Sequence, residues 1–203
     1  MLKKWFEIVS DHKVSLRERM YRIVTVICMV ALICILPMGK NIWNILLLAA
    51  SLIAMSMIVK FSIRKGCINC GATAISVMLL LIFPVSFFTA GGFYSGMPEW
   101  FVLCFIYICI TLEGRRMAVF FGLCAAETIL CYYVAYYFPN MILRHEQSHT
   151  FFDSAFSVIM VGMLTSVLLM FLNRLYEDEN ELSRQQKKEI EELNKAENHF
   201  FPV

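Results

Sequence analysis

Charged residues are scarce in this sequence, and their scarcity argues against a soluble protein. Only 17% of the 203 residues are Asp, Glu, Lys or Arg, whereas ordinary soluble domains contain about 25%. Hydrophobic residues make up 59% of the chain, and its mean hydropathy is +0.66. A soluble domain of this size could not bury so much apolar surface, and a disordered chain, a collagen or a coiled-coil rod has a different composition. The sequence therefore predicts an integral membrane protein.

Several motifs with known chemistry are also missing. The sequence contains no Walker loop, no dinucleotide-binding glycine pattern and no paired-carboxylate site. A net charge of +2 leaves no excess of basic residues of the kind that nucleic-acid binders carry. We therefore expect no nucleic-acid partner and no cofactor.

Long apolar runs are abundant. A helix needs about 20 apolar residues to cross a hydrocarbon layer about 30 Å thick. Six runs approach this length, and they predict an all-α polytopic membrane protein with six transmembrane helices followed by a cytoplasmic helical stalk. The fourth run is short. We expect the span either to include Gly96 and Met97 or to extend towards Glu113, with local thinning of the bilayer. The approximate bounds of the six runs are 21–38, 43–59, 71–90, 98–112, 117–138 and 151–172.

The distribution of Lys and Arg predicts the orientation. Sixteen of them lie in the N-terminal segment, in the second and fourth connections and in the tail, whereas the other side holds only Lys40 and Arg144. Basic residues are retained on the cytoplasmic side of a membrane. We therefore expect a multi-pass protein of a bacterial inner or plasma membrane with both termini in the cytoplasm.

The tail after the last apolar run is a predicted helix. Residues 173–199 contain no Gly or Pro, and oppositely charged pairs such as Lys187 and Glu191 are four residues apart. Its heptad seam is only about half apolar, which predicts a marginal coiled coil through which two copies of the chain would pair. The alternative is a solvated continuation of the last span.

Residues 145–149 form an H-E-x-x-H motif. On a helix, His145 and His149 would share one face and bind zinc, and Glu146 would activate the bound water. A third protein ligand would have to come from Asp153 or Glu127. The motif lies in a short connection without a protease cleft. We therefore favour a polar, pH-sensing or metal-sensing loop over a zinc peptidase.

Cys67 and Cys70 form a C-x-x-C pair in the second connection. One such pair supplies two thiolates, whereas a structural zinc site needs four ligands, and no redox-domain pattern surrounds it. We expect two reduced thiols.

The third connection is rich in glycine, proline and aromatic residues. Pro84 should kink or break the third span because it lacks a backbone donor, whereas Pro98 suits the first turn of the next helix. The connection is either a helical hairpin within an aromatic belt or a small outward-facing pocket for an apolar or amphipathic ligand. Glu127, near the middle of the fifth span, either joins such a site or forms a structural hydrogen bond between helices. The candidate ligand-binding residues are Pro84, Gly91, Gly92, Tyr94, Trp100 and Glu127.

Residues 83–103 read FPVSFFTAGGFYSGMPEWFVL. This stretch resembles the third and fourth spans of bacterial membrane sensor histidine kinases, in which F-P-x-x-F-F-x-x-G-G-x-x-S-G-M-P-x-W-F recurs. Residues 152–154 (FDS) and 161–162 (VG) are similar to the start of their last span. Residues 175–177 (LYE) and 191–201 are similar to the lead into their dimerisation and phosphotransfer helix.

The resemblance implies the membrane-embedded sensory and anchoring module of a two-component sensor histidine kinase. In the family the lead continues into an S-H-E-I-R-T-P segment with the phosphorylated histidine, whereas here Pro202 and Val203 follow. His199 precedes the place of that segment and is therefore not the phosphoacceptor. The resemblance implies a chain without the catalytic part and without catalytic activity as given, which is either truncated or a stand-alone input module. The regions would be a cytoplasmic amphipathic lead-in (1–20), a six-span sensory domain (21–172) and a cytoplasmic signalling helix (173–203).

The expected partners are the lipid bilayer, a second copy of the chain and a kinase or response regulator. The alternative functions are a stand-alone membrane regulator or a small transporter that uses Glu127, and then a membrane zinc peptidase that uses His145, Glu146 and His149.

Overall fold

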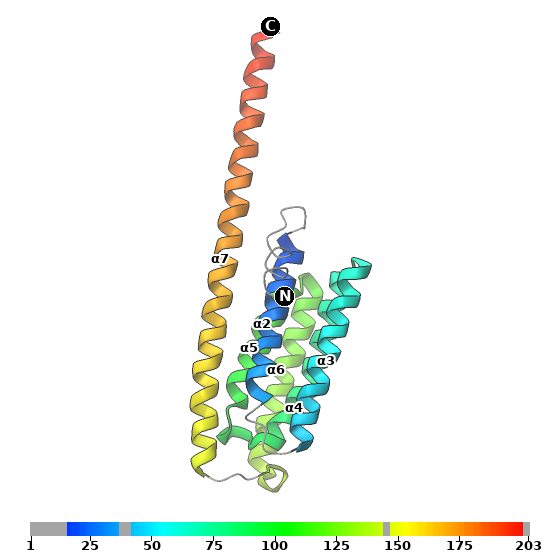
Figure 1. Cartoon of the computed structure of the whole chain (residues 1–203), viewed down its shortest axis with the longest axis vertical. Helices are drawn as coiled ribbons and strands as arrows, with labels where there is room; N and C mark the ends of the chain where they lie inside the picture. Colours follow the sequence, from blue (N-terminus) through cyan, green and yellow to red (C-terminus); the bar gives the residue numbers. More distant parts are fainter. Residues whose placement is uncertain (1–15, 37–41, 144–146, 201–203) are drawn as a thin grey trace. The chain divides into compact units, whose positions relative to one another are not determined.

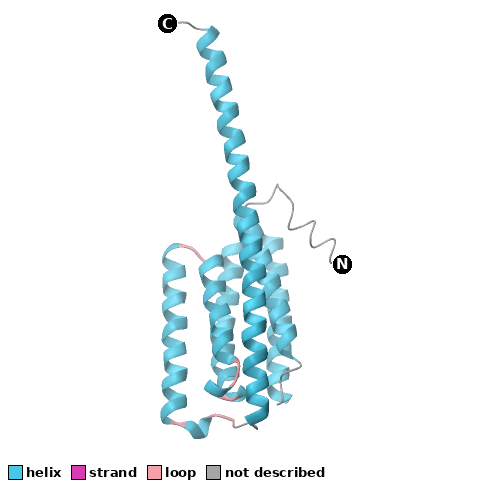
Figure 2. Ribbon diagram, turned by 90° about the vertical axis from the view of Figure 1, so that its left-hand side faces the viewer, coloured by secondary structure: helices cyan, strands magenta, loops and turns pink. Residues whose placement is uncertain are grey.

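The fold is helical. A computed structural model of the chain describes residues 16–36, 42–143 and 147–200, and within these ranges it contains helices and no strand. The chain forms two compact units, Met1–Leu168 and Leu169–Val203. Figures 1 and 2 show helices joined by short connections. The elements are α2 (Leu16–Ile35), α3 (Ile42–Lys65), α4 (Ile68–Ala90), η2 (Gly92–Tyr94), α5 (Met97–Thr111), α6 (Gly114–Tyr137), η3 (Pro139–Met141) and α7 (Gln147–Phe200).

Four of these helices are long and apolar enough to cross a membrane. They are α3, α4, α6 and the part of α7 within Thr150–Glu192. Helix α5 is apolar but has only 15 residues, and α2 has 20 residues with four charged side chains near its start. The all-α prediction is confirmed for the described residues, and the four apolar helices are compatible with the predicted membrane protein.

In the first unit, α4 and α5 lie between the other helices (Figure 1). Helix α4 packs against α2, α3, α5 and α6, and α5 packs against α2, α4 and α6. The fully buried side chains follow this arrangement, with Ile75 and Phe87 on α4 and Tyr107 and Ile108 on α5. Because α5 is enclosed by protein on several sides, its short apolar run does not have to face lipid along a full span.

Helix α6 has the opposite character. Many of its apolar side chains are exposed, as a helix that faces lipid requires, because lipid tails solvate such groups as well as a protein core does. These exposed residues include Val119, Phe121, Leu123, Ile129 and Leu130.

Helix α4 continues through Pro84 from Ile68 to Ala90. Of the two predicted effects of Pro84, a break of the third span is therefore wrong, although proline removes one backbone donor, and a kink stays a prediction. Membrane helices tolerate such residues where neighbouring groups satisfy the freed carbonyl. Pro98, by contrast, lies in the first turn of α5 as predicted, and α5 begins one residue earlier, at Met97.

The two ends of the first unit differ in chemistry. At one end, the arginine end, Arg17 Nη1 lies 3.0 Å from Glu113 Oε2, which joins the start of α2 to the connection between α5 and α6. At the other end, the turn end, Leu143 N donates to the Phe88 carbonyl oxygen at 3.0 Å. The turn end also holds the connection between α4 and α5, which contains three of the six candidate ligand-binding residues, Gly91, Gly92 and Tyr94.

Candidate functional site

The connection between α4 and α5, residues 91–96, is a compact turn that we call the glycine turn. Gly91 has φ +120° and ends α4, and its N–H donates to the Phe87 carbonyl oxygen. Ser95 Oγ donates to the Gly92 carbonyl oxygen at 2.8 Å and accepts from Met97 N at 3.3 Å. The turn therefore satisfies several of its own backbone groups, as buried polar backbone requires.

The neighbouring connection packs on this turn. Gly92 has φ +64°, a conformation that favours glycine, and a Cβ at this position would lie 2.9 Å from Ile142 Cδ1. The hydrogen bond from Leu143 N to Phe88 fastens the same connection to the end of α4. Gly92 is therefore needed both for its backbone angle and for the close approach of Ile142.

Two hydrogen bonds join the glycine turn and α5 to α7. Gly96 N donates to Asp153 Oδ2 at 3.0 Å, and Trp100 Nε1 donates to Ser157 Oγ at 2.9 Å. The two donors are four residues apart, as are the two acceptors, so one helical turn of α7 faces the start of α5. Trp100 and Ser157 are 4% and 1% exposed, so this contact lies inside the protein.

Gly96 lets the two segments approach closely. A Cβ at this position would overlap the Ser157 side chain and would lie 2.8 Å from the Asp153 carbonyl oxygen. The buried face of α7 then continues through Val161, Leu164 and Leu168, at the spacing of one helix face. The turn and α7 therefore form one packed interface with two polar contacts at its end.

Aromatic side chains fill the space beside the turn. The Phe87 ring has no exposed surface, and its centroid lies 6.1 Å from those of Phe93 and Phe101 and 5.7 Å from that of Tyr132. The Phe93 and Tyr132 centroids are 5.3 Å apart. Such tilted and edge-to-face pairs stabilise an aromatic cluster beyond the area they bury. Four elements, α4, η2, α5 and α6, thus meet through these rings.

The structure brings together most, but not all, of the predicted ligand-binding residues. Gly91, Gly92 and Trp100 are buried at the turn end, Pro84 is half-buried on α4, and Tyr94 is 74% exposed. Glu127 belongs to a different environment, because its electrostatic neighbours are the thiols of the buried residues Cys104, Cys124 and Cys131. Its Oε1 is buried without a hydrogen-bond partner among the described residues.

The H-E-x-x-H motif is only partly described. His145 and Glu146 lie outside the described residues, and His149 belongs to the first turn of α7. Asp153, one of the two predicted third ligands, accepts the hydrogen bond from Gly96. Within the described ranges, no group of three or more His, Cys, Asp or Glu side chains is placed to hold a metal ion.

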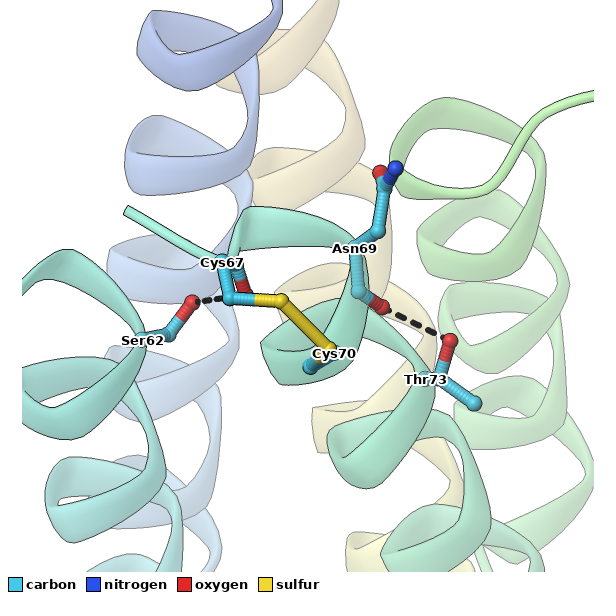
Figure 3. Close-up of a disulfide and its surroundings, with 5 residues drawn as sticks. All are labelled: Ser62, Cys67, Asn69, Cys70 and Thr73. Carbon is cyan, nitrogen blue, oxygen red and sulfur yellow. Dashed lines mark hydrogen bonds between the residues drawn. A yellow bond between two sulfur atoms is a disulfide. The ribbon is translucent and has the colours of Figure 1, made fainter. Parts of the chain in front are cut away.

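Cys67 and Cys70 form a disulfide at the start of α4, at the arginine end (Figure 3). The expectation of two reduced thiols is therefore wrong for this structure. Cys67 is the residue before α4 and Cys70 lies in its first turn, which places their Cα atoms 5.5 Å apart, within the range that a disulfide spans. The Ser62 hydroxyl donates to the Cys67 carbonyl oxygen at 2.9 Å and ties this turn to α3.

Sequence reasoning missed the close contact between Gly96 and Ser157. One pattern in the sequence could have indicated the contact. Asp153 and Ser157 are four residues apart, as are Gly96 and Trp100, so each pair lies on one face of a helix. Polar and small residues on one face are typical of helix contacts in membranes.

Comparison of the chain with protein families, curated proteins and solved structures finds no match. The resemblance to sensor histidine kinases therefore rests on the motif residues themselves.

Proposed function

We propose that this chain is the sensory and anchoring module of a two-component sensor histidine kinase. It would have six membrane spans, with both termini in the cytoplasm and a helical stalk that pairs with a second copy. The observation that carries the proposal is the pair of hydrogen bonds from Gly96 and Trp100 to Asp153 and Ser157. They connect a buried turn to a helix that continues to Phe200.

The mechanism would be a shift of α7 relative to the glycine turn. A ligand or a membrane state can move such an equilibrium only if it interacts differently with the two arrangements. The arrangement of α7 beside the turn is defined by two hydrogen bonds and by the close approach that Gly96 permits. Since α7 is one continuous helix, a change at Asp153 and Ser157 would be carried along the helix to its charged segment.

A register experiment tests this proposal without knowledge of the stimulus. Residues 1–200 are fused to the phosphotransfer and ATP-binding domains of a sensor kinase, with zero to four extra residues at the junction. Each inserted residue rotates the downstream helix by about 100°, so autophosphorylation in membrane vesicles should rise and fall with a helical period. We expect the highest and lowest outputs to differ by about fivefold or more.

The matched control for the register experiment inserts the same residues in a fusion that lacks residues 1–172. If the output of the full fusion does not depend on the number of inserted residues, or follows the control, the chain does not transmit a signal through its helix.

The six-span topology is tested with alkaline phosphatase fusions. We expect active phosphatase after Tyr94 and after Met141, and inactive phosphatase after Lys65 and after Arg116, because basic connections are retained in the cytoplasm. The fusion after Arg116 is the most informative of the four. If the 15-residue α5 did not cross the membrane, this fusion would be active, which would contradict the six-span proposal.

A further inference from the structure

The arginine end of the first unit contains a cavity of about 280 Å³. Three different segments line it, namely the start of α2, the start of α4 and the connection into α6. Ligand pockets for drug-sized molecules measure about 300–1,000 Å³, so this cavity suits a small group rather than a whole nucleotide. Its lining residues are Arg17, Asn69, Leu112, Glu113, Arg115 and Arg116.

The lining is positively charged. Three guanidinium groups face a single carboxylate, and that carboxylate, Glu113, is paired with Arg17 at 3.0 Å. Arg115 and Arg116 have no ion-pair partner within the described ranges, and Arg17 Nε is buried there without an acceptor. Arg115 and Arg116 are exposed, so the cavity opens to solvent and presents more charged donors than the protein's own acceptors pair with.

Two uncharged groups, the Asn69 side chain and the first backbone N–H groups of α6, add hydrogen-bond donors to this positively charged lining. The Asn69 side chain points away from the Cys67–Cys70 disulfide (Figure 3), and the same residue lines the cavity. Helix α6 begins at Gly114, and Glu113 before it makes no side-chain capping hydrogen bond. The first N–H groups of a helix have no acceptor within the helix, and they carry partial positive charge.

We infer that this cavity binds a phosphate group. Arginine guanidinium groups match the geometry of phosphate oxygens. Several guanidinium groups together favour a phosphate, which has more acceptor oxygens, over a single carboxylate. Two sources fit this chemistry, the headgroup of an anionic phospholipid and a soluble phosphate. A phosphate bound here would join α2, α4 and α6 at one end of the unit, independently of any signal that α7 carries.

The test uses the purified full chain in detergent, in two arms. In the first arm, native mass spectrometry counts bound phosphatidylglycerol against phosphatidylcholine at equal concentration. In the second arm, inorganic phosphate is titrated at constant ionic strength, and the midpoint of thermal unfolding is followed, because a ligand of the folded state raises it. Saturable binding of phosphatidylglycerol assigns a lipid headgroup, and saturable binding of inorganic phosphate assigns a soluble ligand.

Three variants decide whether the binding occurs in this cavity. Arg115→Gln combined with Arg116→Gln should weaken the binding about tenfold or more, because charged hydrogen bonds are lost. Arg64→Gln, at the same end but outside the lining, should change it less than about twofold. Glu113→Gln should strengthen it, because the competing carboxylate is removed and Arg17 is released. A gain in affinity cannot arise from misfolding.

The inference is overturned by any of three results. These are the absence of saturable binding in both arms, an equal loss in Arg64→Gln and the double arginine variant, and weaker binding in Glu113→Gln.

Discussion

The variant Gly96→Ala is expected to be less stable than the native chain by about 1–3 kcal/mol, the usual cost of overpacking a well-packed site. The added Cβ would overlap the Ser157 side chain and lie 2.8 Å from the Asp153 carbonyl oxygen. The second contact is decisive, because a backbone atom cannot rotate away and α7 itself must move. The backbone of Gly96 has φ −76° and ψ 4°, which any residue adopts, so the cost arises from space alone.

Gly162→Ala is the matched control for this variant. A Cβ on Gly162, also on α7, meets no atom within 4 Å, and alanine favours a helix over glycine by about 0.5–1 kcal/mol. We expect this control to be at least as stable as the native chain in thermal unfolding. Combining Gly96→Ala with Ser157→Gly should recover part of the loss. If Gly96→Ala were as stable as Gly162→Ala, the close approach of α7 to the glycine turn would be wrong.

The helices could be predicted from the sequence because their apolar runs are long. The ends of the helices were harder to predict, since hydropathy falls at the first charged residue while backbone hydrogen bonding continues. Helix α3 shows this, because the predicted run ends at residue 59 and the helix continues to Lys65. Long basic side chains can lie along the helix and reach the membrane surface, so their charge does not end the helix.

The contacts of the site could not be predicted in the same way. Trp100 and Ser157 are 57 residues apart, and no local pattern in one sequence states that they meet. The aromatic residues of the third connection did indicate an unusual site, but their packing into a cluster around Phe87 depends on three helices. The arginine cavity has the same origin, because Arg17, Asn69 and Arg115 come from different helices.

The disulfide shows a different limit. The spacing of Cys67 and Cys70 permits both a bonded pair and two thiols, and the expectation of thiols rested on the absence of further zinc ligands and of a redox-domain pattern. The structure adds the backbone geometry at the start of α4, which brings the two Cα atoms within bonding range. The bonded pair is therefore a feature of the three-dimensional structure that the C-x-x-C spacing alone did not indicate.

Truncation of Trp100 is expected to have the largest effect on stability of any side chain at the turn end. The indole is 4% exposed, and replacing a buried Phe or Trp with alanine costs about 3–5 kcal/mol in soluble proteins. In a bilayer, lost packing rather than transfer from water supplies this cost, so we take the range as an upper bound. Trp100→Ala should therefore lower the midpoint of thermal unfolding more than any of the glycine variants.

Trp100→Phe separates packing from hydrogen bonding, because it keeps a ring but loses the Nε1 donor to Ser157. Hydrogen bonds between membrane helices contribute about 0.6 kcal/mol on average and at most about 1.7 kcal/mol, so Trp100→Phe should retain most of the stability that Trp100→Ala loses. In a double-mutant cycle with Ser157→Ala, the coupling should fall within that range and should vanish in a matched cycle that pairs Trp100→Phe with Ser166→Ala. Ser166 donates to the Gly162 carbonyl oxygen within α7 and is exposed. A coupling of zero to Ser157 would mean that the hydrogen bond from Trp100 does not stabilise the contact with α7 and has no part in the proposed transmission.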